Sequence, residues 1–185
     1  MTIRDWQRLG DEELVHYKAF TVRKSRRRSP RTEADIGFFL IDTPDWVNII
    51  AITTDDEIVL VRQFRHGSDR ASLEAPGGLI DPGEDDPAVA AARELREETG
   101  YVAAKIECIG VMNPNPAIFT NRCHTYLATG CRRVGELELD PGEDIEVVTI
   151  PTAAIDESVR QGEIYHAIVL ASLAFWRVAA AKTGR

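Results

Sequence analysis

The sequence predicts an α/β fold with a small β-sheet annex near its N-terminal end. Runs of β-branched and aromatic residues, which are typical of strands, alternate with turn signals along most of the chain. A segment of helix-forming residues at 88–99 lies between two groups of strand patterns, and an apolar helical segment follows at 164–180. Together these patterns favour a sheet covered by helices.

Composition and charge limit the classes of protein to which the chain can belong. It has 185 residues, of which 44% are hydrophobic and 28% charged, so we expect a folded protein with a substantial core. The formal net charge of −8 argues against a nucleic-acid binder. Three cysteines without CxxC spacing indicate a reducing compartment, and no apolar segment is long enough for a membrane span or typical of a secretion signal. We therefore expect a cytoplasmic protein without membrane partners.

The predicted strands divide the chain into residues 1–45, the annex, and residues 46–185, the main domain. Strand patterns occupy 15–22, 37–41, 46–53, 57–62, 106–111, 124–129 and 146–150. The acidic segment 54–56 indicates a hairpin between two of these strands. Residues 23–35 are expected to form a strand end and a loop. Their basic run, 23–31 (RKSRRRSPR), is interpreted either as a solvated part of the annex or as a patch that attracts RNA or nucleotide phosphates. The net charge of −8 favours the first interpretation.

The central helix has recognisable signals at both ends. Proline and glycine punctuate residues 74–84, so a shaped loop precedes it. Asp85 or Asp86 can cap the helix, Pro87 suits its first turn, and Gly100 stands where a left-handed C-terminal residue belongs. Further helices are predicted at 152–159 and 164–180. The apolar stripe expected on the last helix consists of Ile168, Leu170, Ala171, Ala174 and Phe175.

Three carboxylates share one face of the central helix. At 100° per residue, Glu94, Glu97 and Glu98 lie at about 0°, 300° and 40°. The face expected to be buried lies near 120° and consists of Ala88, Ala91, Ala92, Leu95 and Thr99. Like charges at these spacings repel, and a divalent cation would relieve them; oxygen ligands without His or Cys select Mg²⁺, Mn²⁺ or Ca²⁺ over zinc. The alternative is a solvated helix face paired with its own arginines.

Two segments carry a resemblance to a known family. Residues 78–84 (GLIDPGE) and 93–101 (RELREETGY) resemble the signature of the Nudix hydrolases. Eight residues, 85–92, separate Glu84 from Arg93, one more than in the family pattern, and the extra residue fits where the loop becomes helix. The resemblance implies an α/β/α sandwich with a mixed sheet and hydrolysis of a nucleoside diphosphate linked to another group.

The resemblance also implies roles for individual residues. Glu94 and Glu98 become the leading ligands of Mg²⁺ or Mn²⁺, with Glu97 as a third and the backbone carbonyl of Gly77 as a further donor. Arg93 and Glu84 would pair and hold the loop against the helix, and Glu84 is included among the metal-site residues. Arg93, Glu97 and Glu98 are also expected to serve catalysis. Such a site would neutralise a diphosphate and direct a water molecule at it.

Residues outside the signature resemble one branch of the family, the ADP-ribose and nucleoside-diphosphate-sugar pyrophosphatases. This resemblance rests on residues 61–65 (VRQFR), on Glu74, which stands shortly before a proline, and on residues 140–146 (DPGEDIE). The branch implies that Arg65 contacts the diphosphate, that Glu74 lies at the substrate and that Glu143 is the catalytic acid of the late loop. Asp144 and Glu146 are alternatives, and 140–146 also fits an ordinary turn. The branch further implies a homodimer built by the N-terminal strands.

Several features and functions stay open at this point. The loop 113–122 (NPNPAIFTNR) could shape a sugar pocket or only stiffen a connection. His124 is interpreted as structural, and His66 as a weak candidate for phosphate contact. Candidates for stacking on a base are Trp6, Tyr17, Phe20 and Trp46, although such residues more often belong to a core or an interface. The alternatives to a nucleotide-sugar substrate are an RNA 5′-pyrophosphohydrolase, a nucleoside triphosphate pyrophosphatase, and a sensing module without catalysis.

Overall fold

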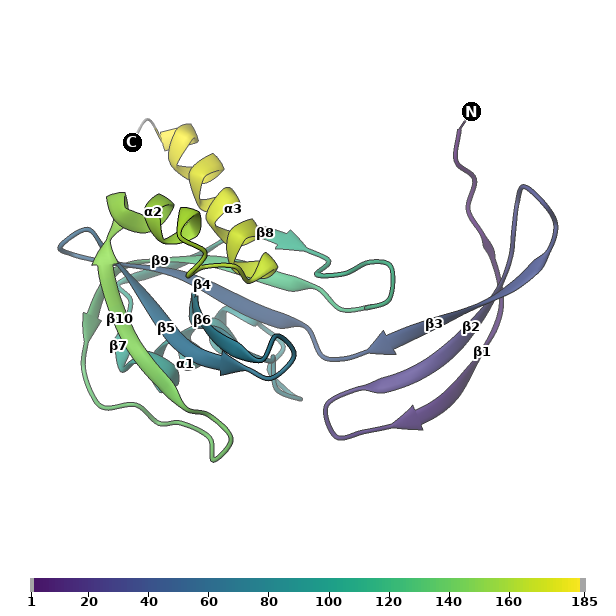
Figure 1. Ribbon diagram of the computed structural model, residues 1–185, viewed down its shortest axis with the longest axis horizontal. Coiled ribbons are helices and arrows are strands. Elements are labelled where there is room, and N and C mark those ends of the chain that lie inside the picture. The colour runs from purple at the N-terminus through teal and green to yellow at the C-terminus, as the bar shows by residue number, and fades with distance from the viewer. Residues whose placement is uncertain (1, 184–185) are drawn as a thin grey trace. The chain divides into compact units, whose positions relative to one another are not determined.

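The computed structural model describes residues 2–183 and divides into two units (Figure 1). The N-terminal unit comprises Met1–Pro44 together with Asn113–Arg122, and the core unit comprises Asp45–Met112 together with Cys123–Arg185. The loop 113–122 therefore groups with the N-terminal strands. It is attached there by backbone hydrogen bonds from Ile41 N–H to the carbonyl of Ile118 at 2.7 Å and from Thr120 N–H to the carbonyl of Ile41 at 3.1 Å.

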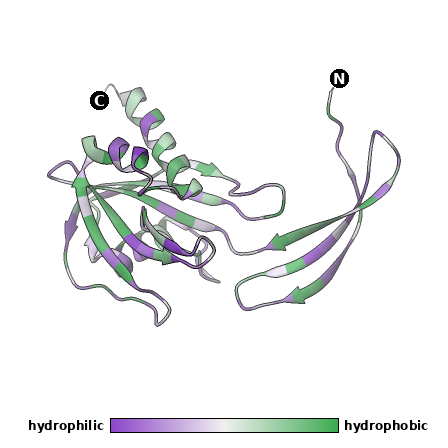
Figure 2. Cartoon of the chain, in the orientation of Figure 1, coloured by the Kyte–Doolittle hydropathy of each residue, from purple (hydrophilic) through white to green (hydrophobic). Residues whose placement is uncertain are grey.

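The N-terminal unit is an antiparallel sheet in the order β1 (Gln7–His16), β2 (Thr21–Arg28), β3 (Asp35–Asp42). The strand expected at 15–22 was wrong, because a turn closed by Tyr17 N–H and the carbonyl of Phe20 at 2.8 Å lies in its middle. Residues 23–28 of the basic segment, expected to be a strand end, instead form most of the central strand, and residues 29–34 form the expected loop. Hydrophobic and hydrophilic residues share these strands (Figure 2).

Cross-strand ion pairs explain why a basic segment forms the central strand. Arg23 donates to Asp42 at 2.5 Å on β3 and to Asp11 at 2.8 Å on β1. Arg28 pairs with Asp35 at 2.8 Å, directly opposite on β3. Opposite charges on facing positions stabilise a sheet, so the acids of the two outer strands offset the repulsion within β2.

The core unit contains a mixed sheet. Within residues 2–183 its strand order is β10 (Ile145–Pro151), β5 (Glu57–Arg65), β4 (Trp46–Thr53), β9 (Cys123–Arg133), β7 (Tyr101–Val102). In addition, β6 (Arg70–Glu74) pairs with β5, and β8 (Lys105–Met112) pairs with β9. The β4–β9 pair is parallel and the others are antiparallel. The hairpin predicted around 54–56 is confirmed as β4–β5.

Helices cover both faces of this sheet, with α1 (Pro87–Thr99) on one side and α2 (Ile155–Arg160) and α3 (Ala167–Thr183) on the other (Figure 1). Side chains alternate along β4, so Val47, Ile49 and Ala51 pack in one core cluster with Leu95 of α1. Ile50 packs in the other cluster with residues of α2 and α3. The predicted α/β/α sandwich with a mixed sheet is confirmed.

The C-terminal helices differ in detail from the prediction. A 3₁₀ turn, η1 (Thr152–Ala154), precedes α2, and α3 begins at Ala167, three residues later than expected. The expected apolar stripe on α3 was only partly right: Ile168, Ala171 and Phe175 are half-buried, but Leu170 and Ala174 are exposed, whereas Val169 and Leu173 are buried. Because most residues of this helix are apolar, the sequence pattern does not select a face, and contact with the sheet decides it.

Two short strands, β6 and β7, were not predicted. β7 has two residues, too few for an alternating pattern, and β6 carries Arg70, Ser72 and Glu74 among its five residues, which does not read as a strand on its own. In residues 2–183 no helix is both long and apolar enough to cross a membrane.

Candidate active site

Helix α1 has the predicted caps. Asp86 accepts a hydrogen bond from the N–H of Ala88 at 2.9 Å, and Pro87 occupies the first helical turn. Gly100 ends the helix in the left-handed conformation, with φ of 73°, and its N–H donates to the carbonyl of Arg96. A Cβ on Gly100 would lie 2.3 Å from the carbonyl oxygen of Gly135. Both the backbone conformation and the space therefore require glycine at this position.

The acidic face of α1 lies partly inside the protein. Glu94 is 8% exposed and Glu98 is 3% exposed, whereas the side chain of Glu97 retains 35% of its exposure. The three carboxylates lie off the apolar face that packs on the sheet, as expected, but Glu94 and Glu98 are nevertheless buried, and Ala92, expected to be buried, is exposed. The reason is tertiary: the loop before the helix covers this face of α1.

The loop that covers the glutamates is fixed by β4. The carbonyls of Pro76 and Gly78 accept hydrogen bonds from Ile49 and Val47 N–H at 2.8 and 2.9 Å. Gly77, between them, donates its N–H to Oε2 of Glu98 at 2.9 Å. In an extended chain the N–H and carbonyl of one residue point to the same side, so the carbonyl of Gly77 is directed toward α1.

Both glycines of this loop make close approaches, and at Gly77 the neighbouring atoms are backbone, which excludes a side chain there. A Cβ on Gly77 would lie 2.2 Å from the carbonyl oxygen of Val47, and one on Gly78 would lie 2.4 Å from Oε1 of Glu94. The backbone therefore passes directly over the two buried carboxylates.

Arg93 connects the loop to the helix. Its Nε and Nη2 donate to the two oxygens of Glu84 at 3.0 and 3.1 Å, so the expected pair is present. Nη2 also donates to the carbonyl of Leu79, and Nη1 donates to Glu94 at 3.0 Å and to Glu97 at 2.9 Å. Hydrogen bonds from Arg93 lower the pKa of Glu84 below its usual value. Arg93 is thus the cation that the described structure places among these carboxylates.

The two buried glutamates are short of positive charge. Burial raises the pKa of Glu94 to about 7, although Arg93 acts in the opposite direction. Burial also raises the pKa of Glu98 to about 8, against the hydrogen bond from Gly77, and the neighbouring charges of Glu94 and Glu143 raise it further. An additional cation beside these groups would favour their ionised forms.

The donor chemistry fits a hard divalent cation. Carboxylate oxygens and a backbone carbonyl are the ligands of Mg²⁺, Mn²⁺ and Ca²⁺. In the arrangement of residues 2–183, three or more His, Cys, Asp or Glu side chains are nowhere gathered into a group that could hold a metal ion. Glu94 and Glu97 instead share Nη1 of Arg93, so a cation bound by both would have to displace that contact.

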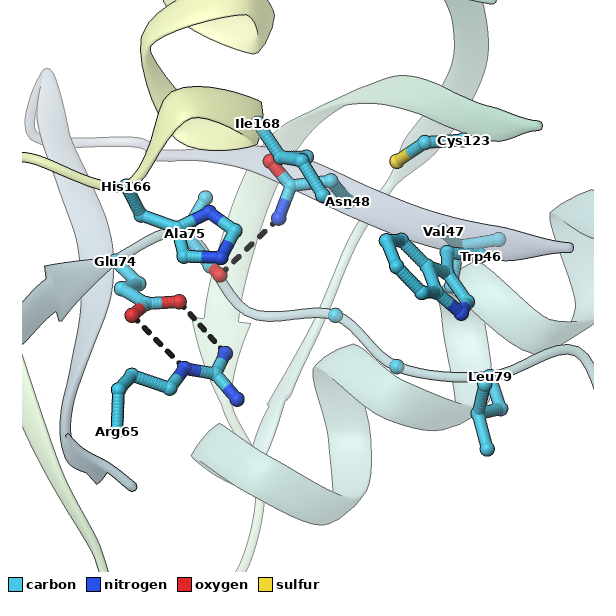
Figure 3. A pocket seen from close by; sticks show the side chains of 12 residues that line it. Trp46, Val47, Asn48, Arg65, Glu74, Ala75, Leu79, Cys123, His166 and Ile168 are labelled. Carbon is cyan, nitrogen blue, oxygen red and sulfur yellow. Dashed lines mark hydrogen bonds and ion pairs between the residues drawn. The ribbon is translucent and has the colours of Figure 1, made fainter. Parts of the chain in front are cut away.

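A second charged pair lies near the glutamates. Nε and Nη2 of Arg65, on β5, donate to the two oxygens of Glu74, at the end of β6, at 2.9 and 2.6 Å (Figure 3). Glu74 is 1% exposed, and the side chain of Arg65 is 41% exposed. Burial alone would raise the pKa of Glu74, but the hydrogen bonds from Arg65 hold it below its usual value. The buried carboxylate therefore fixes the guanidinium, whose Nη1 has no hydrogen-bond partner among the described residues.

Arg65 lies between two cavities. The first, of about 330 Å³, is shown in Figure 3. Its lining consists of Trp46, Val47, Asn48, Arg65, Glu74, Ala75, Gly77, Gly78, Leu79, Cys123, His166 and Ile168. The second, of about 690 Å³, is also lined by Arg65 and His166, together with Phe64, His66, Tyr165 and Glu143 among others.

The three candidate acids of the late loop differ in their surroundings. Glu143 is exposed, lines the second cavity and accepts a hydrogen bond from the N–H of Asp140 at 2.9 Å. Glu146 instead pairs with Arg62 at 3.2 Å on β5. Asp144 is exposed and does not line either cavity described here. Of the three, Glu143 is therefore the acid that the fold brings to the side of Arg65.

Histidines divide between structural and site positions. His124 lies 3.1 Å from Asp45 through its Nε2, in agreement with a structural histidine. His66 packs edge to face against Phe64, with ring centroids 5.3 Å apart, in the lining of the second cavity. His166, which the sequence interpretation placed inside a helix, lies just before α3 and lines both cavities. The signal that could have found it is the pair Tyr165 and His166 between two apolar segments.

An α/β/α sandwich with buried glutamates on a helix and an arginine fixed beside a cleft is an arrangement that suits a hydrolase of phosphate anhydrides. The model of the NUDIX domain matches residues 43–168, and the chain belongs to this family. The match covers β4 to the start of α3 and therefore both cavities.

Named relatives agree with this assignment. An ADP-ribose pyrophosphatase of Mycobacterium tuberculosis is 31% identical over 174 residues, which cover 94% of this chain and 84% of the relative. An ADP-ribose pyrophosphatase of Bacillus subtilis is 33% identical over 129 residues, which cover 69% of each chain. A solved structure titled as the crystal structure of an ADP compounds hydrolase has a TM-score of 0.86 at 24% identity. It covers 100% of this chain and 99% of that one, and supports the fold.

Proposed function

We propose that this protein is a metal-dependent pyrophosphatase that hydrolyses the diphosphate of nucleoside diphosphate sugars, with ADP-ribose as the representative substrate. The products are a nucleoside monophosphate and a sugar phosphate. The observation that carries the proposal is that the Arg65–Glu74 pair shares one cleft with Gly77 and Gly78, the two loop residues that contact the buried Glu98 and Glu94 of α1. The names of the relatives supply the substrate class.

The cofactor of the proposed reaction is Mg²⁺ or Mn²⁺. Glu94 and Glu98 would be its leading ligands, with Glu97 and the carbonyl of Gly77 as further donors. When bound, the cation supplies positive charge against the diphosphate. Glu84 is engaged by Arg93 through both oxygens, so its main role is to keep the loop on the helix, and it would join the metal site only by leaving that pair.

The side chains of the cleft have separate tasks. Arg65, held by Glu74, binds a phosphate oxygen with the donors that Glu74 does not use. Glu143 accepts a proton from the attacking water. The water oxygen forms a bond to one phosphorus while the bond from that phosphorus to the bridging oxygen breaks, and the bridging oxygen leaves with the other phosphate. Arg93 holds Glu94 and Glu97 and so positions the acidic face.

A substrate panel tests the proposal. Hydrolysis of ADP-ribose, GDP-mannose, ATP and a 5′-triphosphate RNA is measured in Mg²⁺ and in Mn²⁺, and products formed in ¹⁸O-labelled water are identified by mass spectrometry. We expect the two nucleotide sugars to be cleaved fastest. Preference for ATP or RNA would support a triphosphate or RNA enzyme instead, and nucleotide-sugar binding without turnover would support a sensing module.

Two variants test the proposed role of Glu143. Glu143→Gln removes the proton acceptor but keeps the size of the side chain, and we expect kcat to fall by about 10²- to 10⁴-fold. Glu146→Gln is the matched control, because Glu146 pairs with Arg62 directly opposite on β5 and neither residue lines a cavity described here. An equal loss in both variants would remove the proposed role.

We also propose a homodimer in the cytoplasm. The N-terminal unit exposes large apolar side chains, among them Trp6, Phe38 and Phe39 at 39%, 39% and 61%. A second copy that covers them would bury surface that a small isolated sheet leaves in water. Cys108, Cys123 and Cys131 are free, which suits a reducing compartment. Sedimentation of the protein and of Phe39→Glu tests the dimer.

A further inference from the structure

The two cavities meet at a pair of residues. Arg65 and His166 line both of them. Arg65 belongs to the proposed diphosphate site, so whatever His166 contacts lies directly beside a bound phosphate. In Figure 3 the imidazole ring lies between Asn48 and the Arg65–Glu74 pair. Neither the family signature nor the roles already proposed include this histidine.

The backbone fixes His166 at the start of α3. Its carbonyl accepts a hydrogen bond from the N–H of Leu170 at 3.1 Å, so His166 is the residue that caps the helix. Its Nδ1 is completely enclosed and has no hydrogen-bond partner among residues 2–183. The part of the ring that remains to line the cavities therefore carries Nε2, which also has no protein partner within the described chain. A ligand in the cleft can reach this nitrogen.

The surroundings of His166 favour the neutral form of its imidazole ring. Burial lowers the pKa of His166, and Arg65 lowers it further while Glu74 acts in the opposite direction. A neutral imidazole adds little attraction for a phosphate, which Arg65 already binds. It does form good hydrogen bonds with a hydroxyl group, which can both donate and accept.

The first cavity has walls that suit an uncharged polar group. Arg65 and Glu74 neutralise each other there, and the other lining residues are uncharged apart from a titratable cysteine and His166 itself. Burial raises the pKa of Cys123 to about 12, so its thiol is neutral as well. Asn48, 7% exposed, has an enclosed Oδ1 without a partner, a second polar atom near this wall. The cavity is also the smaller of the two, which suits the smaller half of a nucleotide sugar.

From this arrangement we infer that His166 is a substrate-binding residue, whose Nε2 hydrogen-bonds a hydroxyl of the sugar half of the substrate in the first cavity. The inference rests on the proposed function, because that function places a phosphate at Arg65. The inference goes further than the proposed function because it assigns the sugar to the first cavity and assigns recognition of the sugar to Nε2 of His166.

Two substitutions separate the two nitrogens of the ring. His166→Asn places a polar group where Nδ1 lies and keeps a good helix cap, but it removes the reach of Nε2. His166→Gln places an amide nitrogen near the position of Nε2. Each variant is assayed with ADP-ribose and with the methyl ester of ADP, which has the same diphosphate and a methyl group in place of the sugar. Thermal unfolding of both variants reports whether the fold is kept.

We expect His166→Asn to raise KM for ADP-ribose about five- to tenfold over His166→Gln, as for the loss of one neutral hydrogen bond. With the methyl ester the two variants should not differ. An equal loss on both substrates, or no rescue by Gln, would overturn the inference. If the unmodified protein cleaved neither substrate, the proposed function itself would fail.

A measurement on the unmodified protein covers the case in which a variant does not fold. The ¹⁵N signals of the histidine rings are followed during titration with ribose 5-phosphate and with methyl phosphate, both in the presence of a chelator. We expect Nε2 of His166 to shift with the sugar phosphate and to stay in place with methyl phosphate. Equal shifts would assign His166 to the phosphate instead and would refute the sugar contact.

Discussion

Binding of a divalent cation to the metal-free protein should release protons. Glu94 and Glu98 have pKa values of about 7 and about 8, so at pH 7 they carry about 0.5 and about 0.9 proton. A cation binds the ionised forms and displaces these protons. We therefore expect about 1.4 protons released per Mn²⁺ at pH 7 and only about 0.1 at pH 9, with tighter binding at the higher pH.

Titration calorimetry measures this release. Mn²⁺ is added to chelator-treated protein in buffers that share one pH but differ in ionisation enthalpy, and the slope of the observed enthalpy gives the number of protons released. Glu98→Gln is the control, since it can no longer lose a proton and should reduce the release at pH 7 to about 0.5 per cation. Binding with zero slope at pH 7 would refute the assignment of these two glutamates as ligands that are protonated when empty.

Three further variants, with four expected outcomes, follow from the same geometry. Glu98→Gln should lower kcat by about 10³-fold or more. The raised pKa of Glu98 makes the metal-free protein lose stability as pH rises from about 4.5 to about 8. At pH 8.5 Glu98→Gln should therefore be more stable than the original protein, by on the order of 3–5 kcal/mol in urea unfolding with a chelator present. Lower stability of the variant would contradict this reasoning. Gly77→Ala should destabilise by about 3 kcal/mol or more, because its Cβ would lie 2.2 Å from a backbone oxygen, whereas Gly67→Ala, with open space, should change unfolding by less than about 0.5 kcal/mol. Arg65→Lys loses the two-pronged pair with Glu74, and its kcat/KM should fall about 10- to 100-fold, mostly through KM; an unchanged KM would place the phosphate elsewhere.

Local signals predicted the central helix well, because its ends depend on short-range chemistry. Asp86, Pro87 and Gly100 act through hydrogen bonds and backbone angles within a few residues of their own positions. The same locality explains the success with the β4–β5 hairpin. The extent of the N-terminal strands could not be read in this way, because the charges of Arg23 and Arg28 are balanced by aspartates on neighbouring strands.

The amino-acid sequence alone predicted an α/β fold and the spacing of three glutamates on one helix, and the resemblance it carries implied the sandwich, the family and the substrate class. Only the tertiary structure decided that Glu94 and Glu98 are buried beneath a loop, that Glu74 locks Arg65, and that His166 faces the same cleft. The physical reason is the distance along the chain over which each kind of interaction acts. Caps and periodicity act over a few residues, whereas burial and the pKa values that follow from it depend on which distant segment covers a side chain.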